Sequence, residues 1–219
     1  MKYHFLLLLL LSNILKASIP GAFSITRIQY DGGGDWYSDP SSIPNLLQYV
    51  KDNTNIKVNT QEKRGKIGDD IFNNSNYFYL TGHGNIKFNH NEAQILRDQL
   101  LNGAFLHADD NYGMDKYFKR EMKNVFPEKE WVELPLDHPI FNIYYKFPNG
   151  LPKIHEHDNK PPQGLALIYN NKIICFYSYE SDLSDGWEDA SMHNNPEHIR
   201  KKALKMGANI LFYAMNRIQ

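Results

Sequence analysis

Two short apolar runs that end in polar, glycine-containing turns constrain the fold of this chain most strongly. Residues 77–80 lead into the turn at 81–84, and residues 104–108 lead into the turn at 109–113. Each run is followed by a segment with helical periodicity, which is the pattern of buried strands in an α/β protein. Ligands of open α/β sheets bind outside the carboxyl ends of the strands. We therefore expect both turns to contribute to one polar crevice.

The N-terminus has the pattern of a secretory signal peptide. A basic start with Lys2 is followed by the apolar run Leu6–Leu11 and by small residues such as Ala17. The apolar run is far shorter than the roughly 20 residues that a membrane-spanning helix needs. We expect cleavage after Ala17, with Ala22 as the alternative. The mature protein would then be periplasmic or secreted, with no stable membrane span.

Composition narrows the class of protein. The chain has 24 basic and 25 acidic residues, and Lys2 and Lys16 leave with the signal peptide, so 22 basic and 25 acidic residues remain, a net charge of −3. With no basic run, we expect no nucleic-acid partner. The one cysteine, Cys175, lies in an apolar segment and excludes an intramolecular disulfide. Residues 23–219 are enough for one well-packed domain, whose stability must come from its core.

Strand-like and helical patterns alternate along this domain. The predicted strands are residues 24–30, 56–58, 77–80 and 104–108, with a later hairpin of 165–169 and 172–177 around Asn170-Asn171. The predicted helices have apolar stripes starting at Ile43, Ala93, Met114 and Ile199, with a capping-box pattern at Asn89 and Glu92 and a start signal at Asn195-Pro196. Prolines between 127 and 164 indicate a short strand and ordered loops there. This order predicts a mainly parallel sheet with helices on both faces.

The turn at 109–113 contains no serine or cysteine, although it lies where α/β hydrolytic folds place a nucleophile. If the turn is catalytic, Asp109 or Asp110 must act as a base, a nucleophile or a metal ligand. Alternatively, one of the two aspartates caps the helix that begins near Met114. The pattern alone leaves both roles open.

Two histidine motifs offer further chemistry. His83 stands between Gly82 and Gly84, which allow a ligand to approach the backbone closely; alternatively, His83 only satisfies loop carbonyls. His155 and His157 would lie on one face of an extended segment, a spacing that suits a divalent metal such as zinc. The third ligand would come from His138, Asp110 or Glu180, and the alternative is a hydrogen-bonding role within the loop.

Two more segments supply candidate ligand contacts. The acidic segment at 179–189 contains Glu180 and Trp187, which offer a carboxylate and an aromatic platform, or else it forms a solvated loop. The glycine-rich segment at 31–37 lacks the order of a dinucleotide-binding motif and the lysine of a P-loop. A divalent metal is therefore the one cofactor that the sequence suggests.

Five motifs carry a resemblance to a known family. They lie at 28–37, 81–84, 106–113, 137–141 and 154–158, and they resemble the domain-of-unknown-function 4159 family of exported bacterial proteins over essentially the whole mature chain. The resemblance implies the class I glutamine amidotransferase-like superfamily, whose fold is a flavodoxin-like three-layer sandwich. The Asp-His-Pro-Ile segment is similar to the trehalose-utilisation (ThuA-like) branch. That superfamily places a cysteine nucleophile where residues 109–111 stand here, so a thioester mechanism is not expected.

These observations lead to two hypotheses. The first is a hydrolase-like enzyme on a small polar or saccharide substrate; the second is a non-catalytic ligand-binding or scaffold module. The candidate catalytic residues are His83, Asp109, Asp110 and Glu180. The candidate ligand contacts are Asp31, Gly33, Gly34, Trp36, Tyr37, Gly82, Gly84, Asn111, Tyr112, His138 and Trp187, and the candidate metal ligands are His155 and His157. Carboxylates at 109 and 110 that both cap a helix would favour the module.

Overall fold

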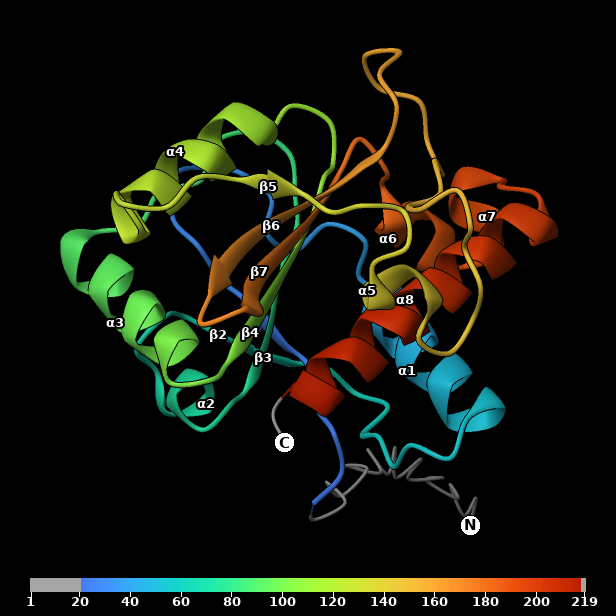
Figure 1. Ribbon diagram of the computed structural model, residues 1–219, viewed down its shortest axis with the longest axis horizontal. Coiled ribbons are helices and arrows are strands. Elements are labelled where there is room, and N and C mark those ends of the chain that lie inside the picture. The colour runs from blue at the N-terminus through green and yellow to red at the C-terminus, as the bar shows by residue number, and fades with distance from the viewer. Residues whose placement is uncertain (1–20, 218–219) are drawn as a thin grey trace, which may run out of the picture.

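A seven-stranded mixed sheet forms the centre of the structure, a computed structural model that describes residues 21–217 (Figure 1). The strands are β1 (Thr26–Ile28), β2 (Lys63–Gly65), β3 (Tyr77–Leu80), β4 (Phe105–Asp109), β5 (Val132–Glu133), β6 (Gln163–Tyr169) and β7 (Lys172–Tyr179). Their order in the sheet is β2-β1-β3-β4-β7-β6-β5. The five neighbouring strands β2, β1, β3, β4 and β7 are parallel to one another. Strand β6 pairs with β7 in antiparallel orientation, and β5 pairs with β6 in the same way.

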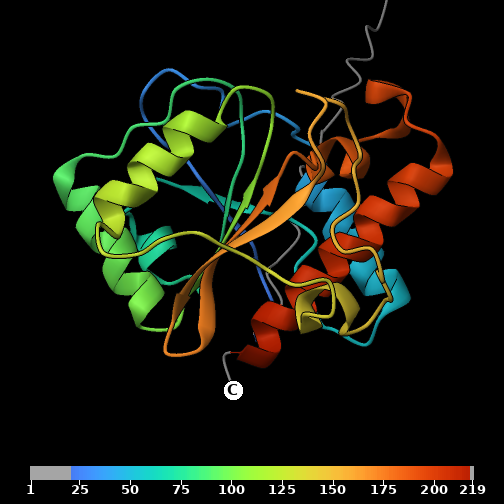
Figure 2. The same ribbon diagram turned by 45° about the horizontal axis from the view of Figure 1, so that its top comes forward.

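Helices cover both faces of this sheet (Figures 1 and 2). One layer contains α2 (Asp70–Asn73), α3 (His90–Leu101) and α4 (Asp115–Val125). The other contains α1 (Ser42–Asn53), α5 (Pro139–Asn142), α6 (Leu183–Trp187), α7 (Ala190–His193) and α8 (Glu197–Arg217). The α/β architecture with a mainly parallel sheet is as the sequence predicts.

The alternation of side chains along the strands divides the core between the two layers. On β3, Tyr77 and Tyr79 pack toward α1 and α8, while Phe78 and Leu80 pack toward α3 and α4. Because successive side chains of a strand point to opposite faces, a strand covered on both faces is mostly apolar. This is why β3 appears in the sequence as an unbroken apolar run.

Most local predictions are confirmed, and one strand prediction is wrong. The capping box at Asn89 and Glu92 is formed at the start of α3, and the β6–β7 turn has Asn170 and Asn171 at positive φ. The segment 56–58 is not a strand of the sheet, because Val58 makes only an isolated bridge to Phe23. The second strand, β2, instead begins seven residues later, at Lys63. Since β2 is the polar triplet Lys-Arg-Gly at the sheet edge, hydrophobicity gave no signal for it.

The predicted signal peptide lies outside the described residues. Among the helices of residues 21–217, none is long and apolar enough to cross a membrane.

A buried histidine lies in the centre of the sheet. His107 on β4 is 1% exposed, its ring packs against Tyr79, Phe176 and Trp187, and its Nε2 lies 3.0 Å from the Ser178 hydroxyl. Burial lowers the pKa of His107 to about 3. His107 is therefore neutral in the folded protein at pH values well above 3.

We expect the buried neutral His107 to make the protein sensitive to acid. Its folded pKa is below the unfolded value, so its contribution to stability is present above about pH 6.5 and is lost as the pH falls from there toward 3. Between pH 7 and pH 5 the wild type should lose about 2 kcal/mol of unfolding free energy relative to a His107→Phe variant. Urea denaturation at the two pH values checks this, and equal losses in both proteins would contradict it.

Candidate functional site

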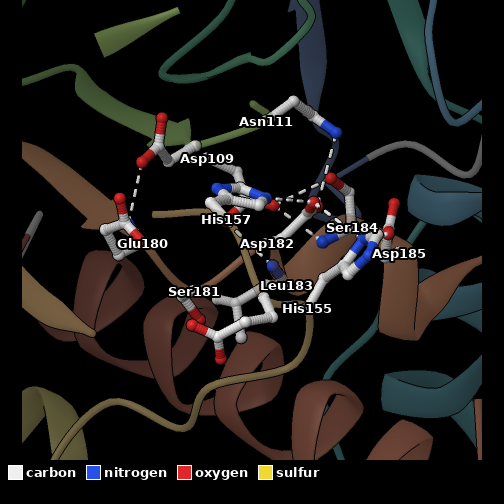
Figure 3. A network of polar contacts seen from close by, with 12 residues as sticks. Asp109, Asn111, His155, His157, Glu180, Ser181, Asp182, Leu183, Ser184 and Asp185 are labelled. Carbon is white, nitrogen blue, oxygen red and sulfur yellow. Dashed lines mark hydrogen bonds and ion pairs between the residues drawn. The ribbon is translucent and has the colours of Figure 1, made fainter. Parts of the chain in front are cut away.

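The carboxyl ends of β1, β3, β4 and β7 place polar segments at one edge of the sheet, as their parallel order requires. The segment that contains His155 and His157 lies against the loop after β7, where Ile154 N–H donates to the Ser181 carbonyl at 2.9 Å. Figure 3 shows residues of this edge in one network of polar contacts. The candidate site is thus assembled from four strand ends and one long loop.

Asp109, the last residue of β4, is fully buried and holds the start of α6. Its carboxylate accepts hydrogen bonds from Leu183 N–H at 3.2 Å, from Ser184 N–H at 2.7 Å and from the Ser184 hydroxyl at 2.8 Å. The Ser178 hydroxyl is a further donor. Burial raises the pKa of Asp109 to about 6 even though these hydrogen bonds oppose the shift. Asp109 is therefore a structural carboxylate that anchors the turn after β7.

The expectation that Asp109 or Asp110 caps the helix near Met114 is wrong. Helix α4 begins after Met114 with no side-chain cap. The acidic residue in its first turn is Asp115. The two aspartates instead bind donors on the neighbouring strand β7 and beyond it, since β4 and β7 are paired in register. These partners lie about 70 residues away in the sequence, so no local pattern predicts them.

Asp110 faces a pocket of about 520 Å³. Its carboxylate accepts hydrogen bonds from the Tyr177 hydroxyl and from Glu180 N–H, both at 2.8 Å. Burial raises the pKa of Asp110 to about 7. The pocket walls also include His157, Glu180 and three tyrosines, which are Tyr112, Tyr117 and Tyr179. A carboxyl that titrates near neutral pH at a pocket wall is suited to proton transfer.

A second pocket of about 400 Å³ adjoins the first, since Tyr112 and His157 line both. Three histidine–aspartate contacts form its wall. Figure 3 labels the residues of two of them, His155 with Asp185 and His157 with Asp182. His155 Nδ1 lies 2.7 Å from Asp185 Oδ2, and His157 Nε2 lies 2.9 Å from Asp182 Oδ2. His193 Nε2 lies 3.3 Å from Asp185 Oδ1. These side chains form two sets of three groups that could hold a metal ion. One set is His155, His157 and Asp182, and the other is Asp39, Asp185 and His193.

Asp39, Asp182 and Asp185 are at most 8% exposed, and their charges face one another. Burial, and next the charge of Asp185, raises the pKa of Asp182 well above its ordinary value; burial and the charge of Asp39 raise that of Asp185. Asn111 separates two of these carboxylates, because its Nδ2 donates to Asp39 Oδ2 at 3.1 Å and to Asp182 Oδ1 at 3.3 Å. Three acidic groups are thus held together in spite of their mutual repulsion.

The backbone that carries these aspartates is fixed by specific contacts. The buried Arg27 donates to the carbonyl of Ser38 at 2.8 Å and to that of Asp39 at 3.1 Å, which holds the loop after β1. Glu180 and Asp182 both adopt left-handed conformations, with φ of 56°. Such conformations cost roughly 1–3 kcal/mol and tend to occur at functional sites.

His83 lies at the rim of the second pocket. Its side chain is half exposed, its Nδ1 lies 3.0 Å from Asp35 Oδ2, and its N–H also donates to Asp35. Gly82 precedes it at a φ of +131°, where a Cβ would collide with the Tyr30 hydroxyl. Only glycine fits there, so the close approach predicted for this turn is made by the protein's own Tyr30.

Several predicted contacts lie away from the pockets. Trp187 is fully buried, with Tyr79 and His107 beside its ring, so it cannot frame a substrate. His138 accepts a hydrogen bond from Ile140 N–H at the start of α5 and packs against Tyr213, and it belongs to none of the possible metal-ligand sets among residues 21–217. Trp187 follows a strand-like segment, and His138 lies in a proline-rich one. Neither pattern predicts the direction in which the side chain points.

The glycine-rich loop after β1 lies outside the walls of the two pockets. Asp31 pairs with Lys66 at 3.2 Å in the exposed part of the loop, and Trp36 packs edge-to-face with the exposed Tyr37. Gly33 has open space around it, whereas Gly34 lies against the carbonyls of the His83 turn. This loop therefore supports the turn after β3. Of the other predicted contacts, Gly84 and Tyr112 line the first pocket and Asn111 lies between the carboxylates.

Sequence reasoning missed Asp39, Asp182, Asp185 and His193. Asp182 and Asp185 stand in the acidic segment that follows β7, and the rule applied to β3 and β4 would have identified them as strand-end groups. Asp39 and His193 had no comparable signal, because they come from loops whose approach depends on α1 and α7.

The fold and the site define an α/β protein with a polar crevice at the carboxyl edge of its sheet. The family model described as Domain of unknown function (DUF4159) matches residues 24–215, and the chain belongs to this family. The resemblance carried by the sequence motifs is thereby confirmed at the level of the family. A comparison with curated proteins finds no significant match.

We expect Asp109→Ala to destabilise the protein by about 3 kcal/mol, because it leaves buried amides of α6 without an acceptor. The free energy of unfolding from chemical denaturation checks this. Asp137→Ala, at an exposed position, is the control and should change the stability by less than about 0.5 kcal/mol. A loss no larger in Asp109→Ala than in the control would contradict the anchoring role.

Proposed function

We propose that this protein is a hydrolase-like enzyme that acts on a small polar or saccharide substrate in the pocket beside Asp110. The observation that carries the proposal is geometric. Asp110, His157 and Glu180 each direct one polar atom to within 4.8 Å of the others, at the wall of an open pocket. Tyrosine rings beside carboxylates suit a substrate rich in hydroxyl groups.

Asp110 is the proposed general base. The Tyr177 hydroxyl and Glu180 N–H fix its orientation, and it faces the pocket rather than a helix terminus. Glu180 is held by Lys153, whose Nζ lies 2.7 Å from Glu180 Oε2, so it contributes fixed charge more readily than proton transfer. His83, oriented by Asp35 on the adjoining pocket, is the candidate proton donor.

A cysteine nucleophile has no place in this proposal. Cys175 is fully buried on β7, and burial raises the pKa of its thiol. The parallel order β2-β1-β3-β4-β7 agrees with the flavodoxin-like order, which supports our proposal that the fold is derived from the amidotransferase-like superfamily. The reaction would then use aspartate and histidine where that superfamily uses cysteine.

Export is part of the proposal. It is supported by the basic start, apolar run and small residues of the first 17 residues. N-terminal sequencing of the secreted product would give Ser18 or Phe23 as its first residue.

The proposal predicts turnover that depends on Asp110. In a screen of ester, amide and glycoside substrates, Asp110→Asn should lower kcat by about 100-fold or more, because the base is lost while the shape is kept. Asp158→Asn, on the same pocket, is the matched control and should retain most of the activity. Circular dichroism would verify that both variants fold.

The pH profile gives a second readout. Burial raises the pKa of Asp110 to about 7, and Asp110 acts as a base when ionised, so in protein freed of divalent cations kcat/KM should rise with an inflection near pH 7. A binding module would instead show saturable ligand binding with no turnover in the whole panel. That result, or full activity of Asp110→Asn, would contradict the proposed function.

A further inference from the structure

The second pocket concentrates buried negative charge without a basic residue to balance it. Among the side chains that the structure describes, the ion-pair partners of Asp39, Asp182 and Asp185 are three histidines, which are His155, His157 and His193. Two other buried carboxylates have a lysine or arginine partner, Glu180 with Lys153 and Glu62 with Arg27. Asp109 and Asp110 are instead held by hydrogen bonds from hydroxyls and backbone amides. Buried carboxylates are stabilised by such partners or by a metal ion.

The six side chains form two sets with the spacing of metal ligands. Within each set, the available nitrogen and oxygen atoms all lie within 4.8 Å of one another. Ligand atoms roughly 2.0–2.2 Å from one zinc ion lie at most about 4.4 Å apart, so small shifts of these side chains would bring them onto one ion. Imidazole and carboxylate groups together are common ligands of zinc and similar divalent ions.

Asp185 connects the two sets. Its Oδ2 lies 2.7 Å from His155 Nδ1 of the first set, and its Oδ1 lies 3.3 Å from His193 Nε2 of the second. A carboxylate with one oxygen toward each set is placed as a bridging ligand. Bridged pairs of ions in enzymes lie about 3.5–4 Å apart.

From this arrangement we infer a divalent-cation centre with two adjacent positions. The first position takes His155, His157 and Asp182, the second takes Asp39 and His193, and Asp185 bridges them. His155 and His193, whose side chains are partly exposed, open the centre to the pocket, so a cation can enter from solvent. Cation binding is independent of catalysis; its use in activating water for the substrate rests on the proposed function.

Asn111 is the positioning residue of this centre. Its Nδ2 donates to both Asp39 and Asp182, one carboxylate from each position. Its Oδ1 accepts from the Thr81 hydroxyl and, at 3.3 Å, from Gly82 N–H, which fixes the orientation of the amide. Such hydrogen bonds to ligating carboxylates orient them toward the metal.

A third set, with Asp110, His157 and Glu180, is not assigned to a metal. Lys153 already balances Glu180, and Asp110 accepts two hydrogen bonds from the chain itself. The third set thus differs from the other two in having a lysine partner for one of its carboxylates, whereas the described ion-pair partners of Asp39, Asp182 and Asp185 are histidines.

The test uses Zn²⁺ alone and protein prepared without a histidine tag. Isothermal titration and elemental analysis after dialysis should give two equivalents of zinc per chain. The double variant His155→Ala, His157→Ala should retain at most one, and so should Asp39→Ala, His193→Ala. His198→Ala, which removes an exposed histidine on α8, is the control and should retain two.

Thermal unfolding of each variant is measured as a control. A cooperative transition shows that the variant is folded, so a loss of zinc cannot be due to misfolding. Less than a tenth of an equivalent in the wild type would overturn the centre, and one equivalent would overturn its two positions. Equal zinc content in the wild type and in the folded His155→Ala, His157→Ala variant would also overturn it. If the protein binds zinc but turns over no substrate, only the proposed function is contradicted. If it turns over substrate but fails to bind zinc, only the cation centre is contradicted.

Discussion

The carboxylate of Asp109 joins the parts of the structure on which the site depends. It is the last residue of β4, it accepts a hydrogen bond from Ser178 of β7, and it binds the first amides of α6. Those bonds fix the turn from β7 into α6; Asp182 lies in this turn, and Asp185 lies in α6 itself. The sheet thereby determines where the acidic wall of the second pocket stands, at the cost of burying a carboxylate whose pKa rises to about 6.

The electrostatics of the crevice follow from this arrangement. The two pockets share a wall but differ in how their charges are balanced. Around Asp110, the protein supplies donors of its own, which are a tyrosine hydroxyl, a backbone amide and, for Glu180, a lysine. Around Asp185, the ion-pair partners within residues 21–217 are histidines. Proton transfer in the first pocket and cation binding in the second are a consistent division of roles, since a bound cation would lie next to the proposed base.

The sequence predicts those features that depend on local chemistry. The capping box of α3, the Asn-Asn turn between β6 and β7 and the buried strand β3 follow from spacing, backbone preference and hydrophobicity. Edge strand β2 escaped prediction because a polar triplet pairs through its backbone alone.

The site was predictable only in part, for the same reason. Strand ends identified Asp110 and Glu180, and spacing identified His155 and His157. The directions of Trp187 and His138, and the approach of Asp39 to His193, depend on packing among distant segments that no local pattern records.

Anomalous diffraction from a crystal of the zinc-loaded protein would locate the two cation positions directly. We expect two peaks about 3.5–4 Å apart, with Asp185 between them and His155 and His157 beside one of them. Histidine–aspartate hydrogen bonds left intact in the presence of zinc, with no peak in the second pocket, would contradict this expectation.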